Sequence, residues 1–107
     1  MTFIFRVRIR PNHSAEEYAA AWVRASAIIQ QAAGARGTRL HRRIGKPDEL
    51  LAVASWDSKA QRDAAPHDPR VEAIVKEAAK YVDIEVIGEF EEPDWTVLPP
   101  ERTSADL

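Results

Sequence analysis

The spacing of apolar residues changes along this chain in an order that few folds can accommodate. An alternating segment comes first, followed by a helical one, two further strand-like segments, a helical region in two parts and a last alternating segment. These segments are residues 2–10, 15–33, 37–45, 50–56, 59–65, 69–78 and 82–90. A repeat of two is typical of a β-strand, and a repeat of about 3.6 residues is typical of an α-helix. The sequence therefore predicts the order β-α-β-β-α-β.

Residues at the ends of the predicted elements support this order. Ser14 and Glu17 are spaced as a capping box, in which the serine hydroxyl accepts a hydrogen bond from the Glu17 N–H. Gly34 stands where a left-handed helix cap is expected, and Pro47 predicts a turn over residues 46–49. The third predicted strand is apolar on both faces, so we expect it to lie centrally in the sheet.

This order is that of a ferredoxin-like α+β fold, a four-stranded antiparallel sheet with both helices on one face. In such a sheet the first strand lies beside the last. Arginines of the first strand would then stand next to acids of the last strand, on the face away from the helices. These residues are Arg6, Arg8 and Arg10 on one strand and Asp83, Glu85 and Glu89 on the other.

The distribution of charge agrees with such pairing. Residues 1–46 contain nine basic and two acidic residues and carry a net charge of +7, whereas residues 47–107 carry −9. The same uncovered face holds Ile4 and Ile87, and a half-apolar face without cover is a natural surface for a second copy. We therefore predict a homodimer, with these residues in its interface: Arg6, Arg8, Glu85 and Glu89.

Composition argues against several classes of protein. The net charge is −2, there is no cysteine, and the three histidines lack the spacing of metal ligands, so nothing suggests binding to nucleic acid, membrane or metal. No apolar run could span a bilayer and no signal peptide is recognisable, which predicts a cytoplasmic location. We divide the chain into a domain, residues 1–90, and an acidic, Pro-rich tail, residues 91–107. The expected anchors of the tail are Trp95, Val97 and Leu98.

Two stretches in the middle of the chain resemble the antibiotic biosynthesis monooxygenase (ABM) domain family. They are the glycine turn and basic strand of residues 34–43, GARGTRLHRR, and residues 51–59, LAVASWDSK, where a strand closes on Trp56-Asp57-Ser58. With the first and last strands, the resemblance covers about residues 1–90. It implies a dimeric α/β barrel, in which two sheets face each other with the helices outside. It also implies cofactor-free oxidation of polycyclic phenols and quinols or haem degradation, but the haem-degrading members carry an Asn on strand one that this chain lacks.

The resemblance places Trp56 beside a pocket between the sheet and the helices. Tyr18 and Trp22 lie one helical turn apart on the buried face of the first helix, where they could wall a flat aromatic substrate. Aromatic residues at such positions more often fill a core, so the sequence leaves a pocket and a packed interior both open.

Two histidines could carry a proton, since imidazole titrates near neutral pH. His41 lies in a strand between arginines, and His67 lies in a loop between Pro66 and Pro69 that could gate a pocket. Ordinary surface histidines would have the same settings. No Gly-rich phosphate loop or serine elbow is present, so nucleotide and hydrolase functions have no support and we expect no cofactor.

Two functions remain open at this point. The leading one is a cofactor-independent monooxygenase of a phenolic or quinol-type small molecule, with Trp56, His41 and His67 as catalytic candidates. The other is a non-catalytic homodimer that binds a small ligand or another protein. An open cavity walled by Tyr18, Trp22 and Trp56, with an inward polar side chain, would favour the enzyme, and a filled interior would favour the binding protein.

Overall fold

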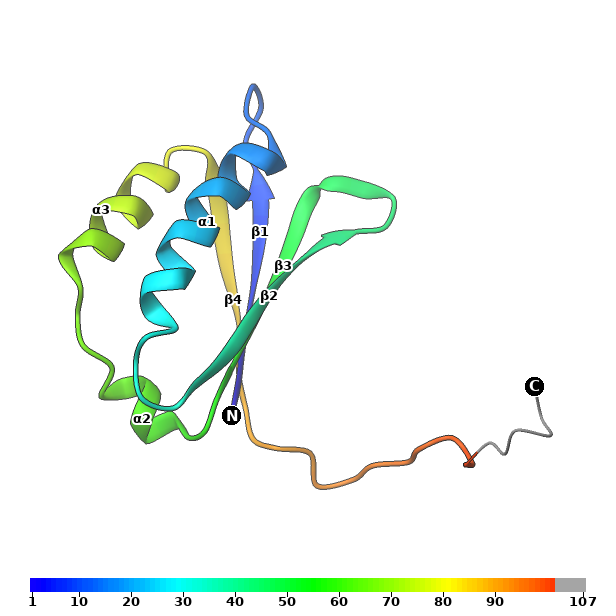
Figure 1. The fold of residues 1–107 in the computed structure, drawn as a ribbon. Coiled ribbons are helices and arrows are strands. Elements are labelled where there is room, and N and C mark those ends of the chain that lie inside the picture. The colour runs from blue at the N-terminus through cyan, green and yellow to red at the C-terminus, as the bar shows by residue number, and fades with distance from the viewer. Residues whose placement is uncertain (102–107) are drawn as a thin grey trace.

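The computed structural model describes residues 1–101, and within them it contains one antiparallel sheet and three helices. The predicted order is confirmed, with the second helical region in two parts (Figure 1). None of the described helices is long and apolar enough to cross a membrane, and the cytoplasmic location stays a prediction. The elements are β1 (Thr2–Ile9), α1 (Ala15–Ile29), β2 (Ala35–Arg43), β3 (Lys46–Trp56), α2 (Lys59–Asp63), α3 (Pro69–Ala78) and β4 (Val82–Phe90).

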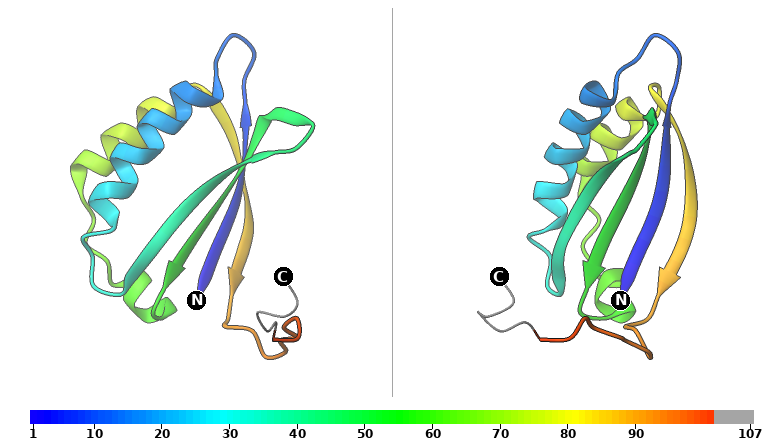
Figure 2. Two further views of the ribbon diagram at one scale, coloured as in Figure 1. Left: turned by 45° about the vertical axis from the view of Figure 1, so that its right-hand side comes forward. Right: turned by 90° about the vertical axis from the view of Figure 1, so that its right-hand side faces the viewer.

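The strands lie in the order β2-β3-β1-β4, and each neighbouring pair is antiparallel. β1 therefore lies beside β4, and β3 is central, as predicted. Helices α1 and α3 lie together over one face of the sheet, and no described helix covers the other face (Figures 1 and 2). The ferredoxin-like α+β fold is confirmed by this arrangement.

Side-chain caps begin the described helices. The Ser14 hydroxyl accepts a hydrogen bond from the Glu17 N–H at 3.1 Å, and Ser58 accepts one from the backbone of α2 at 3.1 Å. Asp68 accepts from the Arg70 N–H at 2.9 Å. Each cap satisfies a backbone donor that the first helical turn leaves without a partner, so these residues determine where the helices start.

Helix α1 ends earlier than predicted, at Ile29 instead of near Ala33. The next residue, Gln30, uses its side-chain oxygen to accept a hydrogen bond from the Gly37 N–H at 2.7 Å. This contact ties the start of β2 to the end of the helix, and β2 begins at Ala35, which pairs with Trp56 of β3.

The turn predicted at residues 46–49 was placed too late, since it lies at Ile44 and Gly45. Gly45 has a φ of 84°, which suits a tight hairpin turn. Pro47 is tolerated inside β3 because β1 pairs with β3 only as far as Glu49. This end of β3 has a described neighbour on one side alone, where a missing N–H costs little.

The packed core lies where α1 begins and α3 ends. Its centre is Val7 of β1, which is fully buried and clusters with Leu50 of β3 and Val82 of β4. Tyr18 of α1 and Ala78 of α3 close this cluster from the helix side. Close packing here joins both helices to three of the strands.

The uncovered face carries the predicted ion pairs between β1 and β4 in part. Arg6 lies 2.7 Å from Glu85 and Arg10 lies 2.9 Å from Asp83. Arg8 instead lies 3.7 Å from Glu49 of β3. The basic strand is therefore held by acids from both of its neighbours.

Glu49 is a carboxylate with only 7% exposure on this face, at the end of the pairing between β1 and β3. Arg43 lies 2.6 Å from it, Arg8 lies 3.7 Å from it and Arg6 lies 3.9 Å from it. The hydrogen bond from Arg43 is the main cause that holds the pKa of Glu49 below its ordinary value. Such surroundings keep the buried carboxylate ionised.

A β-bulge in β4 reverses the predicted orientation of Glu89. Ile87 is an extra residue opposite the step between residues 4 and 5 of β1, where the register shifts. Beyond it Glu89 pairs with Phe3, so it faces the helices. Its assignment to the outer face was wrong, and with it the reason for placing Glu89 in a homodimer interface, because strict alternation stops at the bulge.

The described part of the tail, residues 91–101, forms no helix or strand. Trp95, Val97 and Leu98 are 90%, 97% and 77% exposed, so the expectation that they anchor the tail on this chain was wrong. The tail contacts the domain at its start, where the Met1 amino group lies 3.1 Å from Glu92. The domain division at residue 90 stays a prediction, and residues 102–107 lie outside the described residues.

Candidate active site

A cavity of about 370 Å³ lies between the sheet and the two longer helices, next to the packed core. Short side chains leave this space open, since Ala25 and Ser26 line it from α1 and Thr38 and Ala54 line it from the sheet. Larger apolar residues complete its wall: Phe3, Phe5, Ile29, Ile74, Val75, Ile84 and Val86.

The three aromatic residues singled out from the sequence, Tyr18, Trp22 and Trp56, all line this cavity. Trp56 ends β3 and is only 5% exposed. Its backbone is fixed twice, because its N–H donates to the Met1 carbonyl and its carbonyl accepts from the Met1 amino group, both at 2.9 Å. The fold thus brings the three together around a hollow, and their contact with a substrate stays a prediction.

Few polar groups reach the cavity. Burial raises the pKa of Tyr18 to about 12, so its hydroxyl stays protonated to higher pH than that of an ordinary tyrosine and can donate a hydrogen bond. Gln30 accepts from Gly37 through its oxygen, which leaves its amide N–H groups as the donors available to a ligand. Within the described residues, no group of three or more histidine or acidic side chains is arranged to hold a metal ion. In pockets with such a lining, a few polar groups fix the orientation of a ligand.

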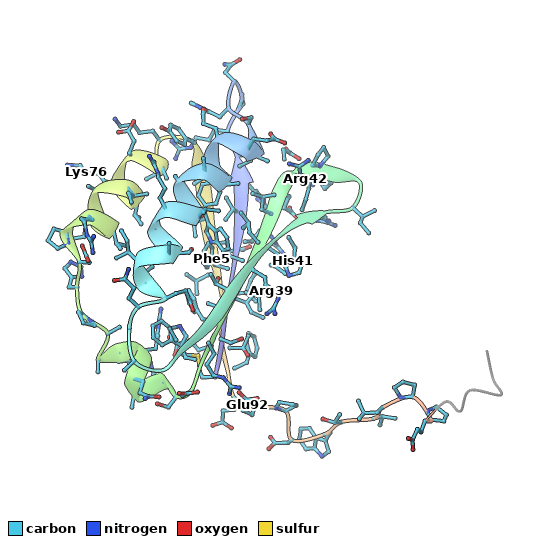
Figure 3. The ribbon with its side chains drawn as sticks, in the orientation of Figure 1. Phe5, Arg39, His41, Arg42, Lys76 and Glu92 are labelled. Carbon is cyan, nitrogen blue, oxygen red and sulfur yellow. The ribbon has the colours of Figure 1, made fainter. Side chains whose placement is uncertain are left out.

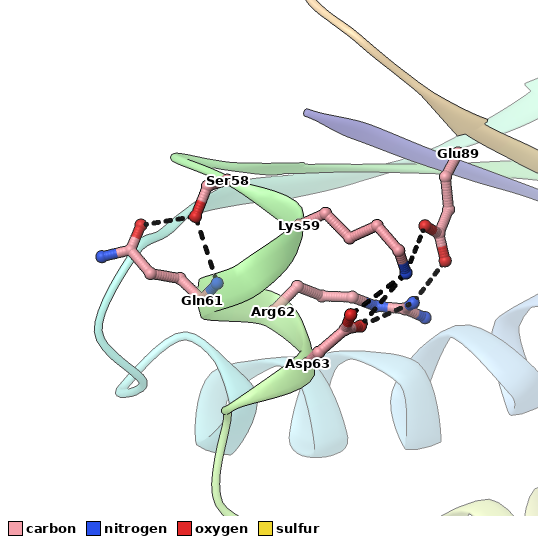
Figure 4. Close-up of polar contacts among 6 residues, drawn as sticks. All are labelled: Ser58, Lys59, Gln61, Arg62, Asp63 and Glu89. Carbon is pink, nitrogen blue, oxygen red and sulfur yellow. Dashed lines mark hydrogen bonds and ion pairs between the residues drawn. The ribbon is translucent and has the colours of Figure 1, made fainter.

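Arg62 of α2 also lines the cavity, and the sequence analysis did not identify it. Its Cζ lies 4.3 Å from the centre of the Phe3 ring, and its Nη1 lies 2.6 Å from Glu89 Oε1 (Figure 4). The sequence feature that could have identified Arg62 is its position on a short helix soon after Trp56. Ser58 caps α2 directly after Trp56, so a long side chain on this short helix can reach the pocket beside that strand end.

A second hollow of about 580 Å³ shares Trp56 and Arg62 with the first. It lies under the loop of residues 64–68 that joins α2 to α3. His67 lines this hollow, and its Nε2 contacts the Glu72 carboxylate. The structure therefore places His67 in the lining of the second hollow and outside the wall of the first cavity, and its catalytic role stays a prediction.

His41 lies on the opposite face of the sheet from the cavity. It pairs with Leu51, which pairs with Arg6, so the three side chains share the uncovered face. Figure 3 shows His41 and Arg39 on β2, with Phe5 beneath the helices. As a residue of this cavity His41 was a wrong candidate, because the sheet separates it from any ligand there.

The family model described as antibiotic biosynthesis monooxygenase matches residues 1–77, which is more than half of the chain. The chain belongs to the ABM family. The resemblance drawn from the glycine turn and from Trp56-Asp57-Ser58 is thereby confirmed. No protein with a curated description matches this ABM sequence.

Solved structures share the fold of this ABM protein. A variant of SnoaB, a cofactor-independent oxygenase from Streptomyces nogalater, matches with a TM-score of 0.77 over 92% of this chain and 96% of its own, at 20% identity. A proposed antibiotic biosynthesis monooxygenase from Bacteroides thetaiotaomicron matches with a TM-score of 0.70 over 92% of this chain and 95% of its own, at 16% identity. At these identities the likeness establishes the common fold.

Proposed function

We propose that this ABM protein is a cofactor-independent monooxygenase that oxidises a phenolic or quinol-type aromatic in the cavity under its helices. The observation that carries the proposal is the open, mainly apolar space walled by Tyr18, Trp22 and Trp56, with the polar side chain of Arg62 at its edge. The fold shared with SnoaB, described as a cofactor-independent oxygenase, supports the same class of activity.

In this chemistry the substrate supplies the electrons. An anthrone-type substrate loses a proton from its ring CH2 group, and the resulting carbanion reduces O2. The CH2 group becomes C=O, so that one oxygen atom of O2 enters the product and the other leaves as water. The protein holds the ring, excludes water and donates hydrogen bonds to the developing oxyanion. The Trp56 indole and the protonated Tyr18 hydroxyl are candidate donors.

Oxygen consumption by the purified protein, without added flavin, haem or metal, tests this proposal. With anthrone as the probe we expect a rate of oxygen consumption above that of a protein-free control, and we expect quinone to form at the same rate. Trp56→Phe keeps much of the packing but loses the indole N–H, and the loss of one hydrogen bond should slow turnover roughly tenfold. His41→Ala is the control and should keep the wild-type rate. No excess rate with anthrone or with several quinols would contradict the proposal.

A non-catalytic homodimer that binds a small aromatic ligand is the second candidate. One observation favours it: among the described residues that line the cavity there is no histidine and no carboxylate to act as a general base. This candidate predicts that an aromatic ligand binds in the cavity and that oxygen is not consumed. The oxygen assay and a binding titration on the same protein therefore separate the two functions.

We also propose that the protein pairs through its uncovered face. Ile4 and Leu51 are half-buried on this face beside the arginines of β1. Arg8→Glu would set a second carboxylate against Glu49, so the dissociation constant of the dimer should rise roughly tenfold or more. Arg24→Glu, on the exposed side of α1, is the control with the same charge reversal, and it should leave the dissociation constant unchanged. Sedimentation measures both, and an unchanged dissociation constant for Arg8→Glu would place the interface elsewhere.

A further inference from the structure

Arg62 differs from the rest of the cavity wall by its charge. Among the described residues that line this cavity, it is the one that carries a full charge at neutral pH. Its side chain is 30% exposed, and it lines both hollows where they meet. A partly buried cation beside an apolar pocket attracts an anion more strongly than a fully hydrated cation does.

The sheet supplies the carboxylate that holds Arg62 in place. The bulge at Ile87 turns Glu89 toward the helices, and bulges often redirect a side chain beside a binding site. Of the guanidinium nitrogens, Nη1 alone makes a hydrogen bond with a described residue, and that partner is Glu89. The N–H groups of Nε and Nη2 therefore remain as donors for a ligand.

Lys59 provides a second cation for the same carboxylate. Its Nζ lies 3.0 Å from Glu89 and 3.1 Å from Asp63 (Figure 4). Glu89 would therefore keep a charged partner if Arg62 moved to contact a ligand. Lys59 is one helical turn from Arg62 but lines neither hollow, so it matches Arg62 in charge and partner without having access to the ligand.

We propose that Arg62 binds an ionised oxygen of the ligand, so that the cavity selects a flat aromatic carrying a phenolate, enolate or carboxylate. The inference rests on the proposed function for the aromatic body of that ligand. The rings would lie against Trp22 and Trp56, and the oxyanion would accept from Nε and Nη2 of Arg62. A cation at this point also favours the ionised form of a bound phenol, whose proton would leave to water through the second hollow.

A matched pair of probes tests this proposal with the full-length protein. 2-Naphthoate is ionised at neutral pH, and 2-naphthamide has nearly the same shape without the charge. In titrations followed by tryptophan fluorescence, we expect naphthoate to bind about tenfold or more tightly than naphthamide, because charge-assisted hydrogen bonds are the stronger kind. Arg62→Met should remove this preference, and Lys59→Met should retain it.

In the titrations of the wild type, Arg62→Met and Lys59→Met, three results would overturn the proposal. They are a wild-type protein without the preference, an Arg62→Met protein that keeps it, and an equal loss in Lys59→Met, which would assign the preference to the overall charge of α2. Thermal melts establish that the variants fold. If Arg62→Met does not fold, Arg62→Lys replaces it. That variant should show a reduced preference, because lysine lacks the planar fork of arginine, and an unchanged preference would again overturn the proposal.

The binding test and the oxygen assay can each reject one proposal without rejecting the other. An Arg62-dependent preference in a protein that consumes no oxygen would retain the anion site and reject the monooxygenase. Anthrone turnover that is unchanged in Arg62→Met would overturn the role of Arg62 and leave the monooxygenase in place.

Discussion

The two ends of the helix–sheet interface share one apolar pattern but differ in packing. Where α1 begins, Tyr18 packs against Val7 and Leu50 in a closed cluster. Where α1 ends, Ala25 and Ala54 line an open cavity of about 370 Å³. The period of apolar residues is the same at both ends, although one end is closed and the other is open. Periodicity thus predicts which face is buried. Whether that face is closely packed depends on which apolar residues occupy it.

The largest expected effect comes from two alanines on the same face of β3. Ala54 lines the cavity and pairs with Phe3, whereas Ala52 is fully buried and pairs with Phe5. Ala54→Leu should fill the cavity and lower anthrone turnover roughly a hundredfold by displacing the substrate, with little loss of stability. Ala52→Leu should overpack the core and cost about 1–3 kcal/mol in the free energy of unfolding.

Oxygen consumption and urea denaturation of both variants measure this contrast. An equal loss of stability in the two would mean that the surroundings of Ala54 are as tightly packed as those of Ala52. The comparison between a closed and an open end of the interface would then be wrong.

Removing side-chain volume gives the converse test. Leu50→Ala, in the closed end, should cost about 2–5 kcal/mol in the free energy of unfolding, because a cavity forms among side chains that cannot collapse into it. Ile29→Ala removes a similar volume from the wall of the open cavity, where Ile29 is already partly exposed, and should cost less. Denaturant melts compare the two, and a larger loss for Ile29→Ala would contradict the assignment of the two ends.

Most of the fold could be predicted from local signals. Alternation in β1, the cap at Ser14, and the change from strand to helical spacing identified the elements and their order. The boundaries that failed depended on contacts between distant residues. The start of β2 at Ala35 depends on its pairing with Trp56 of β3, and the position of Pro47 in β3 depends on where β1 stops.

The candidate site was only half predictable for the same reason. Tyr18, Trp22 and Trp56 follow from helical spacing and from a family motif, whereas the cavity between them is lined by residues from all seven helices and strands. Arg62 reaches the site through the placement of a short helix, and Glu89 comes into contact with Arg62 through a bulge whose one sequence signal was Gly88 inside a strand. Neither can be read from a repeat of two or of 3.6 residues.

Tyr18 carries the smallest expected effect, and it belongs to both ends of the interface, since it packs in the core cluster and lines the cavity. Burial raises its pKa from 10.0 to about 12, so the folded protein keeps the phenol neutral to higher pH than the unfolded chain does. The unfolded chain therefore releases this proton first, and stability should fall as the pH rises from 10 toward 12. In Tyr18→Phe that contribution is absent, so its free energy of unfolding should fall less over the same interval.

Urea denaturation of both proteins across this range isolates Tyr18 from the other groups that titrate there, with Tyr81→Phe as the control for losing a phenol. Parallel curves for wild type and Tyr18→Phe would mean that the Tyr18 hydroxyl is hydrated through the cavity. The closed end would then stop short of Tyr18, and a ligand in the cavity would meet an ionisable phenol instead of a fixed donor.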